Sequence, residues 1–560
     1  MKRFLALFIA LTLTLSFGVA AFAEEAPIEL TILRTISPSI DPTNPYFDWE
    51  DYYRIVEEAC NVKLSFMDVA NDDVNEAVQI VLASSDLPDI LLWGHYQLVK
   101  PQDMFVNGQI IDMAQYSDCI QDYLNYIEPY TPILKNVYDE EGHLLFFCQP
   151  RVAIEDAYSG GLVIRRDWLD KLEMDLPETL DDWLAYLRAV KTTDLNGDGL
   201  NNEIPYWGDK GVVTVWMNYF GLNKLDFAMH GGLGGEVIYS GLEEERMKGA
   251  LSFLHTLYEE ELINHDYLTA NGDNRDTLLA QGLIGSTWTF LTDSSSWNSM
   301  ESEDPNMLFW GVTSPTYNGE KWFEYTDIQN KMQSGAACVT TSCENPEAAL
   351  RMLNWFYTEE GNMLYEFGME GVHYTVDEES GLPVMADWIT NNPEGLTPNQ
   401  AMEKYTALPG FIAPTIGLKK AIINMGDPAT RGSILDVYCP DYDAEHNLSM
   451  PNLTYTAEEL DTFNAIIVDV KTYMEETIHQ YINGTLDVEN YGETVEAIKS
   501  MGIETALEIN RAAHQRWLEK SGIAFTPSEN PITLREYMKY IPLTTEKGIE
   551  YLSEDLIPIE

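Results

Sequence analysis

Strand and helix patterns alternate between Glu29 and Trp93, and this order constrains the fold of the chain more than any other feature. Short apolar patterns typical of strands cover 29–33, 63–69 and 89–93, and helical patterns cover 49–59 and 72–83 between them. Strands joined by helical crossovers of this length pair in parallel with right-handed connections. The sequence therefore predicts an α/β protein with mostly parallel sheets flanked by helices.

The same alternation returns later, and the chain then becomes helical. Thr179 is positioned to cap a helix over 180–190, with Asp181 and Asp182 in its first turn. From 457 to 518 the pattern is almost wholly helical, with breaks at Gly484 and Gly502. Further strands are predicted at 144–148, 162–165, 282–287 and 336–341, and a further helix at 347–356.

The first residues have the features of a secretory signal peptide. Lys2 and Arg3 precede an apolar run over 4–17, and Ala21-Phe22-Ala23 offers a site for cleavage after Ala23. We therefore expect residues 1–23 to be removed and the protein to be exported. Because the first cysteine is Cys60, we expect no lipid-attachment cysteine after the apolar run.

Charge and length limit the function classes further. The formal net charge of −58 argues against a nucleic-acid partner, because phosphates would be repelled. Solvation of the exported surface explains this charge better than a general affinity for cations. A length of 560 residues suggests two or more domains. The six cysteines decide nothing about disulfides, because a core of this size does not need them.

The most specific motif runs from Asp194 to Glu203. Oxygen-bearing side chains at its first, third and fifth positions are followed by a glycine at the sixth, the pattern of a loop that wraps a hard cation. An EF-hand would place its bidentate glutamate at the twelfth position, where this chain has Pro205, so this loop closes earlier. The predicted calcium ligands are Asp194, Asn196, Asp198, the Leu200 carbonyl, Asn202 and a bidentate Glu203.

This set provides about seven oxygens, the number that calcium prefers, whereas magnesium demands a tighter octahedron. The alternative is an Asn/Gly/Asp turn that needs no metal. We favour calcium because the alternation of ligands is so complete. All ligands are used by the loop, so the predicted role of the ion is structural and not catalytic.

Several blocks together resemble extracellular solute-binding protein family 1, in particular its large calcium-containing branch for oligosaccharide and alginate importers. The blocks follow in the family's order through nearly the whole chain. One departure is the missing lipid-attachment cysteine, which leaves the mode of retention at the cell open. The blocks are 84–90 (SSDLPDI), 162–172 (LVIRRDWLDKL), the loop 194–205, 345–350 (NPEAAL), 368–374 (GMEGVHY), Gly484, Met501-Gly502 and Arg516.

The resemblance implies a two-lobed type II periplasmic-binding-protein fold with a helical C-terminal block. It also implies a carbohydrate ligand, an ABC permease as partner, and a monomer. The expected domains are a signal peptide (1–23), the first part of lobe 1 (24–157), the first part of lobe 2 with the calcium loop (158–335), the return to lobe 1 (336–422), and the completion of lobe 2 (423–560).

A sugar site needs aromatic platforms for CH faces and polar groups for hydroxyls. Ligands in such folds bind beyond the carboxyl ends of strands. Most tryptophans are core residues, which is the competing interpretation for each tryptophan in the set. The candidate ligand-binding residues are Arg34, Trp93, Trp216, Thr287, Trp288, Trp297 and Trp310.

Enzyme motifs are missing from the sequence: it has no GxSxG, HExxH or Walker pattern. We therefore expect no catalytic residues. A secreted calcium-containing lyase or glycosidase is the alternative from another class, and it predicts product formation. A sensory or adhesive surface protein is a third possibility, and it predicts binding without an importer. The sequence does not define which sugar is bound.

Overall fold

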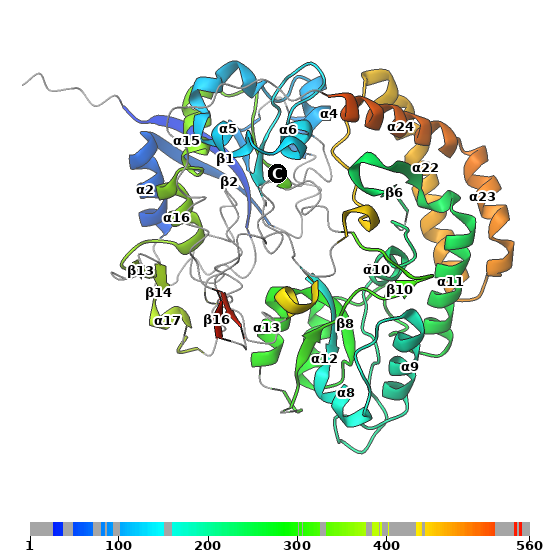
Figure 1. Cartoon of the computed structure of the whole chain (residues 1–560). Helices are drawn as coiled ribbons and strands as arrows, with labels where there is room; N and C mark the ends of the chain where they lie inside the picture. Colours follow the sequence, from blue (N-terminus) through cyan, green and yellow to red (C-terminus); the bar gives the residue numbers. More distant parts are fainter. Residues whose placement is uncertain are drawn as a thin grey trace, which may run out of the picture.

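Two hydrophobic cores divide the chain into two lobes in a computed structural model (Figure 1). The first core joins residues before 150 with residues of 332–374, and the second joins 162–312 with 467–507. The structure describes residues 26–36, 49–70, 80–84, 87–92, 101–150, 160–223, 225–300, 302–304, 306–324, 332–376, 383–390, 392–394, 401, 433–438, 443–520, 543–545 and 548–550.

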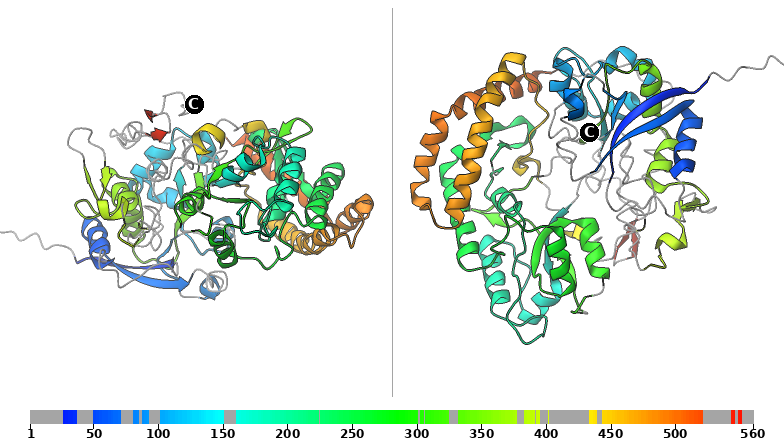
Figure 2. Two further views of the ribbon diagram at one scale, coloured as in Figure 1. Left: turned by 90° about the horizontal axis from the view of Figure 1, so that it is seen from below. Right: turned by 180° about the vertical axis from the view of Figure 1, so that it is seen from behind.

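The first lobe is built on a five-stranded sheet of order β2-β1-β3-β12-β4. Helices α2, α15 and α16 flank this sheet (Figures 1 and 2). The elements of this lobe are β1 (Ile28–Ile36), α2 (Trp49–Cys60), β2 (Val62–Ala70), β3 (Ile90–Leu92), α4 (Pro101–Val106), η2 (Met113–Cys119), α5 (Gln121–Ile127), α6 (Thr131–Val137), β4 (Phe147–Pro150), β12 (Met332–Val339), α15 (Pro346–Trp355), α16 (Glu359–Phe367), β13 (Tyr374–Val376), β14 (Pro383–Met385) and α17 (Asp387–Thr390).

The second lobe surrounds a three-stranded sheet of order β8-β5-β9. Helices α11, α22, α23 and α24 form its outer wall (Figures 1 and 2). Its elements are β5 (Gly160–Arg165), α8 (Arg166–Leu172), α9 (Leu180–Lys191), α10 (Val212–Asn218), β6 (Phe227–His230), η3 (Gly232–Gly234), β7 (Glu236–Tyr239), η4 (Ser240–Leu242), α11 (Glu244–Glu259), α12 (Gly272–Ala280), β8 (Ser286–Phe290), α13 (Leu291–Ser299), β9 (Phe309–Gly311), β10 (Thr316–Tyr317), β11 (Glu320–Lys321), η5 (Ser433–Tyr438), η6 (Ala444–His446), α22 (Ala457–Ile482), η7 (Val488–Asn490), α23 (Tyr491–Ser500) and α24 (Ile503–Glu519).

The direction of the strands differs from the sequence prediction in part. β1 pairs in parallel with β2 and β3, as predicted for the N-terminal units. β12 runs antiparallel to β3 and β4, and β5 runs antiparallel to β8 and β9. The expectation of mostly parallel sheets is therefore wrong for the second lobe. β12 belongs to no local strand–helix–strand unit, because it joins the sheet only after the chain has passed through the second lobe.

The predicted C-terminal block is helical over α22, α23 and α24, with breaks at Gly484 and Gly502. Beyond it, the chain forms a β-hairpin, β15 (Leu543–Thr545) with β16 (Gly548–Glu550), so the block 423–560 is not helical throughout. The expected crossings at 157 and 422 and the signal peptide at 1–23 lie outside the described residues. The expected return at 336 falls within β12.

The lobes also touch away from the crossings, where the end of α24 meets α6. The buried Asn136 side chain accepts hydrogen bonds at Oδ1 from Trp517 Nε1 (3.0 Å) and from the Asn452 backbone N–H (3.1 Å). Arg516 donates to Glu140 Oε1 at 2.8 Å. Because Asn136 and Glu140 belong to the first lobe and their partners to the second, this contact fixes one edge of the interface between the lobes.

Five of the six cysteines lie within the described residues, and all five are free thiols. No helix among the described residues combines the length and the apolar character that crossing a bilayer requires. The packing of the two cores therefore stabilises the described fold without a described disulfide.

A buried ion pair anchors the second sheet. The fully buried Arg165 guanidinium donates to Asp304 Oδ2 at 2.5 Å and to Asp167 Oδ2 at 2.7 Å, and it lies 4.2 Å above the Trp168 ring. Burial acts to raise the pKa of Asp304, but the Asn306 N–H and Arg165 outweigh it and hold that pKa below its usual value. Each of the three charged side chains, Arg165, Asp167 and Asp304, therefore has a partner of opposite charge.

We predict that Asp304→Ala destabilises the protein by about 3–5 kcal/mol, because it removes one carboxylate from a guanidinium that stays buried. Urea unfolding measures this free energy. Glu260→Ala is the control, because it breaks the more exposed Arg188–Glu260 pair (2.6 Å) and should cost less than about 1 kcal/mol. Equal effects of the two substitutions on the free energy of unfolding would show that burial of the Arg165 pair does not increase its contribution to stability.

Candidate functional site

The candidate site is organised by a short segment, 204–207, that pairs with the start of β8. The Ile204 N–H donates to the Leu283 carbonyl and the Gly285 N–H donates to the Ile204 carbonyl, both at 2.9 Å. The Trp207 N–H then donates to the Ser286 carbonyl at 2.9 Å. This ladder joins the end of the acidic loop 194–203 directly to the strand that carries Trp288.

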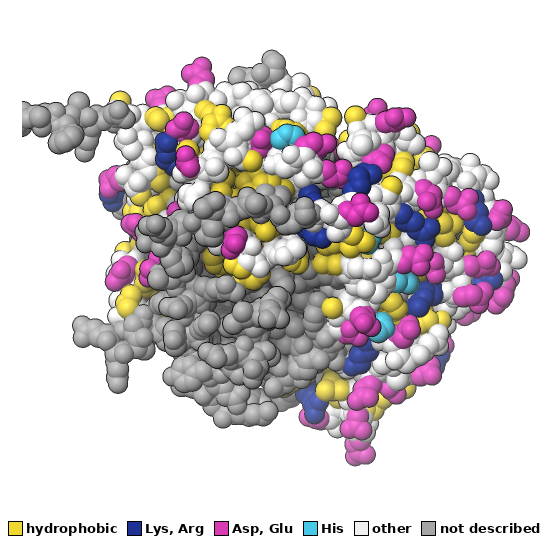
Figure 3. All heavy atoms as spheres, turned by 45° about the horizontal axis from the view of Figure 1, so that its top comes forward, with side chains coloured by type: hydrophobic (Ala, Val, Ile, Leu, Met, Phe, Trp, Pro, Cys, Tyr) yellow, Lys and Arg dark blue, Asp and Glu magenta, His cyan; other side chains and the backbone are white. Residues whose placement is uncertain are grey.

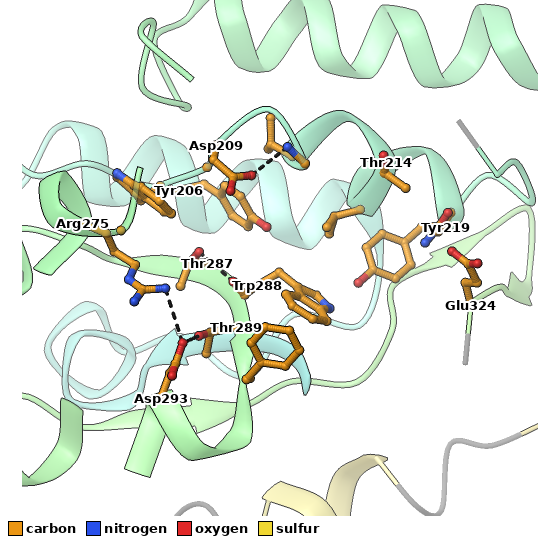
Figure 4. A pocket seen from close by; sticks show the side chains of 18 of the residues that line it. Tyr206, Asp209, Thr214, Tyr219, Arg275, Thr287, Trp288, Thr289, Asp293 and Glu324 are labelled. Carbon is orange, nitrogen blue, oxygen red and sulfur yellow. Dashed lines mark hydrogen bonds and ion pairs between the residues drawn. The ribbon is translucent and has the colours of Figure 1, made fainter. Parts of the chain in front are cut away.

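A cavity of about 410 Å³ opens beyond this ladder, and we call it the aromatic cavity (Figure 4). Its wall comes from the segment after the ladder, from α10 and α12, and from the carboxyl end of β8. Aromatic and carboxylate side chains dominate this wall. The residues that line it include Tyr206, Trp207, Asp209, Thr214, Asn218, Tyr219, Arg275, Thr287, Trp288, Thr289, Phe290, Asp293, Phe323 and Glu324.

Trp288 and Phe290 give the aromatic cavity its apolar surface. The two rings meet edge to face with centroids 5.2 Å apart, and the Phe290 side chain is 51% exposed. Behind the indole ring lies Gly160 of β5, where an added Cβ would come within 2.9 Å of Trp288. An exposed aromatic ring in a cavity wall is suited to contact with the apolar face of a ligand.

Polar groups surround these rings. Arg275 donates through its guanidinium to Asp293 Oδ2 at 3.4 Å and to Asp276 Oδ1 at 3.1 Å, and it lies 4.9 Å above the Trp297 ring. Thr289 donates to the same Asp293 oxygen at 3.3 Å. Burial raises the pKa of Asp293 above its usual value, although Arg275 opposes this shift. The network fixes one guanidinium and one carboxylate beside the aromatic rings.

A second cavity of about 580 Å³ lies between the lobes, and we call it the interlobe cavity. Residues 101–102, 136–138 and 145–146 line it from the first lobe, and Phe227, Tyr455 and Lys471 are among its lining residues from the second. Glu324 lines both cavities. Glu324 is the last described residue of the second lobe before β12, which belongs to the first lobe's sheet, so this carboxyl lies near the crossing.

The environment of Glu324 disfavours negative charge. Burial raises the pKa of its carboxyl to about 7, and the nearby charge of Asp226 adds to the shift. Lys471 donates to Asp226 at 2.6 Å. At neutral pH, Glu324 is therefore close to the midpoint of its titration, between a charged and a neutral form.

The acidic loop 194–203 is held in shape by hydrogen bonds between its own side chains and backbone. Asp194 accepts hydrogen bonds from the backbone N–H groups of Gly197 (2.8 Å) and Gly199 (2.9 Å). Asp198 accepts from the Leu200 N–H at 2.7 Å, and this bond is the main cause that lowers its pKa. Gly199, at the sixth position, has φ +85°, a conformation that an L side chain rarely adopts.

Glu203 is the buried member of this loop, with 4% of its surface exposed. Its Oε1 accepts from the backbone N–H groups of Leu195 (2.5 Å) and Asn196 (3.3 Å). Its Oε2 is buried and has no hydrogen-bond partner. A buried carboxylate oxygen without a partner is unfavourable, so this atom fits the ligand set of a bound cation.

The structure separates the predicted ligand residues into three groups. Thr287 and Trp288 line the aromatic cavity. Trp216 and Trp297 are 0% and 5% exposed and pack in hydrophobic cores, so neither provides an open platform in this conformation. Arg34, which is paired with Asp68, and Trp310, which lies on β9 opposite Ile164, line neither of these two cavities. Trp93 lies outside the described residues.

Sequence reasoning missed most of the cavity wall. Tyr206, Trp207 and Asp209 follow the predicted loop within a few residues, and their aromatic and acidic character was a usable signal. Arg275 and Asp293 had no such signal, because α12 and α13 bring them together only in the folded chain. Glu324 was missed for the same reason.

Comparisons with known proteins support the fold. Lipoprotein LipO of Bacillus subtilis is 23% identical over 525 residues, covering 90% of this chain and 96% of that protein. The fructooligosaccharide ABC transporter substrate-binding protein FusA of Streptococcus pneumoniae is 22% identical over 542 residues, covering 90% of each chain. The alginate-binding protein AlgQ2, solved without calcium ion, aligns with a TM-score of 0.70 at 19% identity, covering 88% of this chain and 98% of that one.

These similarities confirm the predicted two-lobed binding-protein fold. The family described as bacterial extracellular solute-binding protein matches residues 46–363, which is more than half of the chain. The protein belongs to this family of bacterial extracellular solute-binding proteins.

Proposed function

We propose that the protein captures an oligosaccharide outside the cell and delivers it to the membrane permease of an ABC importer. The family is extracellular, and relatives over most of the chain's length are named for binding fructooligosaccharide, polygalacturonan or rhamnogalacturonan. These relatives are solute-binding proteins and not enzymes, so we propose stoichiometric capture without turnover.

The aromatic cavity is the observation that carries this proposal. A sugar has apolar CH faces and a rim of hydroxyl groups, so its site combines aromatic rings with hydrogen-bonding groups. Trp288 and Phe290 provide rings, while the Arg275–Asp293 pair provides both a donor and an acceptor within the same wall. The carboxylate accepts from hydroxyls, and the guanidinium donates to hydroxyl or ring oxygens.

Lobe closure is the proposed mechanism. A ligand that contacts both lobes stabilises the closed form through contacts that the open form lacks. The interlobe cavity offers surfaces of both lobes, and Glu324 lies near the crossing between them. The closed form would then dock on the permease.

We predict that a sugar of the right class raises the melting temperature of the wild-type protein and is recovered unchanged. At 100 times its Kd, the ligand should add about 2.7 kcal/mol of stability. Trp288→Ala should weaken binding at least about tenfold, which calorimetry measures. Trp355→Ala on α15, a partly buried residue packed against the core of the first lobe, is the control and should leave the affinity unchanged. Degraded sugar would instead favour the alternative of a lyase or glycosidase.

Small-angle scattering tests lobe closure separately. We expect the radius of gyration to decrease when the ligand identified in the thermal screen is added, because rotation of the lobes shortens the particle. Binding with an unchanged scattering curve would contradict closure while leaving ligand capture intact.

We also propose that the loop 194–203 binds calcium as a structural ion. The proposed ligands are Asp194, Asn196, Asp198, the Leu200 carbonyl, Asn202 and Glu203, a set of hard oxygen donors of the kind that calcium prefers. The unpartnered Oε2 of Glu203 supports this assignment. Among the solved neighbours, one structure of FusA is described as an EF-hand mutant, and AlgQ2 was solved without calcium ion.

The loop's position gives the ion a structural task. Glu203 is followed at once by Ile204, which begins the ladder to β8 and thus to Trp288. A bound ion would neutralise the loop's carboxylates and hold the start of this ladder in place. We therefore expect calcium to stabilise the second lobe and to support sugar binding without contacting the sugar.

We predict that EDTA lowers the melting temperature of the wild-type protein and that added calcium restores it. Glu203→Gln should weaken calcium binding at least about tenfold, because it removes a charged oxygen ligand while its remaining oxygen can still accept from the Leu195 N–H. In EDTA, this variant should melt no lower than the wild type. Asn201→Ala, within the loop but outside the ligand set, is the matched control. A wild-type melting temperature that is unchanged by EDTA and by added calcium would contradict a calcium site in this loop.

A further inference from the structure

The charges of the aromatic cavity are unbalanced among the described residues that line it. Asp209, Asp293 and Glu324 contribute three carboxyl groups, and Arg275 contributes the one guanidinium. Figure 4 shows these groups around the space beside Trp288. A ligand that enters the cavity therefore meets more acidic groups than basic ones.

The guanidinium of Arg275 is already engaged by carboxylates. Asp276 Oδ1 lies 3.1 Å from its Nε, and Asp293 Oδ2 lies 3.4 Å from its Nη1. Its face is stacked on the Trp297 ring at 4.9 Å. A carboxylate on a ligand would have to displace Asp293 or Asp276, or share an edge with one of them, to form a bidentate pair with this guanidinium, and the site would then hold a further anion beside both.

The basic group that lines the interlobe cavity is also paired with a carboxylate. The cavity's one described basic side chain, Lys471, is bonded to Asp226 at 2.6 Å, and Glu324 lies on the same wall. In the described part of the chain, neither cavity presents a lysine or arginine that lacks an acidic partner.

The raised pKa of Glu324 also indicates that the site disfavours a further negative charge. Burial and the charge of Asp226 raise the pKa of this carboxyl to about 7. A position where an existing carboxyl takes up a proton near neutral pH is an unfavourable place for a further carboxylate. Hydroxyl groups face no such barrier, because they can donate to the carboxylates already present.

We propose that the site selects neutral oligosaccharides and excludes oligomers of uronic acids. The inference rests on the proposed function and narrows its substrate class. Family membership leaves this choice open, since the names of the similar proteins include both a fructooligosaccharide binder and an alginate binder. The cavity charges of this chain, and not its family, carry the assignment.

The test uses matched pairs of oligosaccharides on the full-length mature protein. Oligomers of galactose, glucose and mannose are compared with oligomers of galacturonate, glucuronate and mannuronate of equal length. In any pair that binds, the neutral member should have a Kd at least about tenfold lower in dilute buffer. The ratio should shrink at high ionic strength, because added salt screens charge repulsion.

Two variants separate the cavity charge from the acidity of the whole protein. Measured above neutral pH, where the Glu324 carboxyl is mostly charged, Glu324→Gln should lower the ratio of uronate Kd to neutral Kd about fivefold, because it removes one charge that faces both cavities. Glu245→Gln removes the same charge from a side chain that is 92% exposed on α11, and it should leave the ratio unchanged. If the two variants changed the Kd ratio equally, the selectivity would come from the overall charge of the protein, and the proposed role of the cavity would be wrong.

The outcomes distinguish this inference from the proposed function. A uronate oligomer that binds as tightly as its neutral partner, or more tightly, overturns the selectivity while sugar capture stands. If no carbohydrate in the pairs or in the wider thermal screen binds, the proposed function fails and the inference fails with it.

Discussion

The described site depends on one short hydrogen-bonded ladder, between Ile204 and the strand that leads to Trp288. On one side of this ladder lies the acidic loop, whose buried Glu203 holds two backbone N–H groups of its own loop. On the other side, β8 delivers Thr287, Trp288 and Thr289 to the cavity wall. The Ser286 hydroxyl adds a bond of 2.7 Å to the Pro205 carbonyl. Backbone hydrogen bonds therefore connect the loop with the strand that carries the aromatic rings.

The two lobes are related by contacts of two different kinds. Between Glu324 and Met332 the chain passes from the second lobe to the first. At Asn136 the end of α24 is held against α6 by a hydrogen bond from Trp517 to the Asn136 side chain. The interlobe cavity is lined by residues near both places, including Asn136 and Glu324. A rotation that closes the lobes must preserve the Asn136 contact or break it. Since Asn136 is 4% exposed and accepts two hydrogen bonds in this contact, breaking it would cost both bonds and expose their donors and acceptor to water.

The features that the sequence predicted well are those decided by near neighbours in the chain. Thr179 caps α9 through a reciprocal bond with Asp182, and the breaks at Gly484 and Gly502 follow from local backbone preferences. Near neighbours in the chain do not show which tryptophans line a cavity and which pack in a core. Trp216 lies on a short helix, and only the fold brings it within 5.4 Å of Trp183 in a core. The antiparallel direction of β12 and the pairing of Arg275 with Asp293 likewise depend on segments far apart in sequence.

Exposed and buried acidic residues of this protein have different effects on the binding of anions. Figure 3 shows acidic side chains scattered over the described part of the face in view, with basic side chains between them. Such exposed charges are solvated and screened, so they add solubility and little local selectivity. Glu324 is of the same residue type, but burial and Asp226 raise its pKa to about 7. Desolvation and the nearby charge of Asp226, and not the net charge of −58, therefore make this site unfavourable for a further anion.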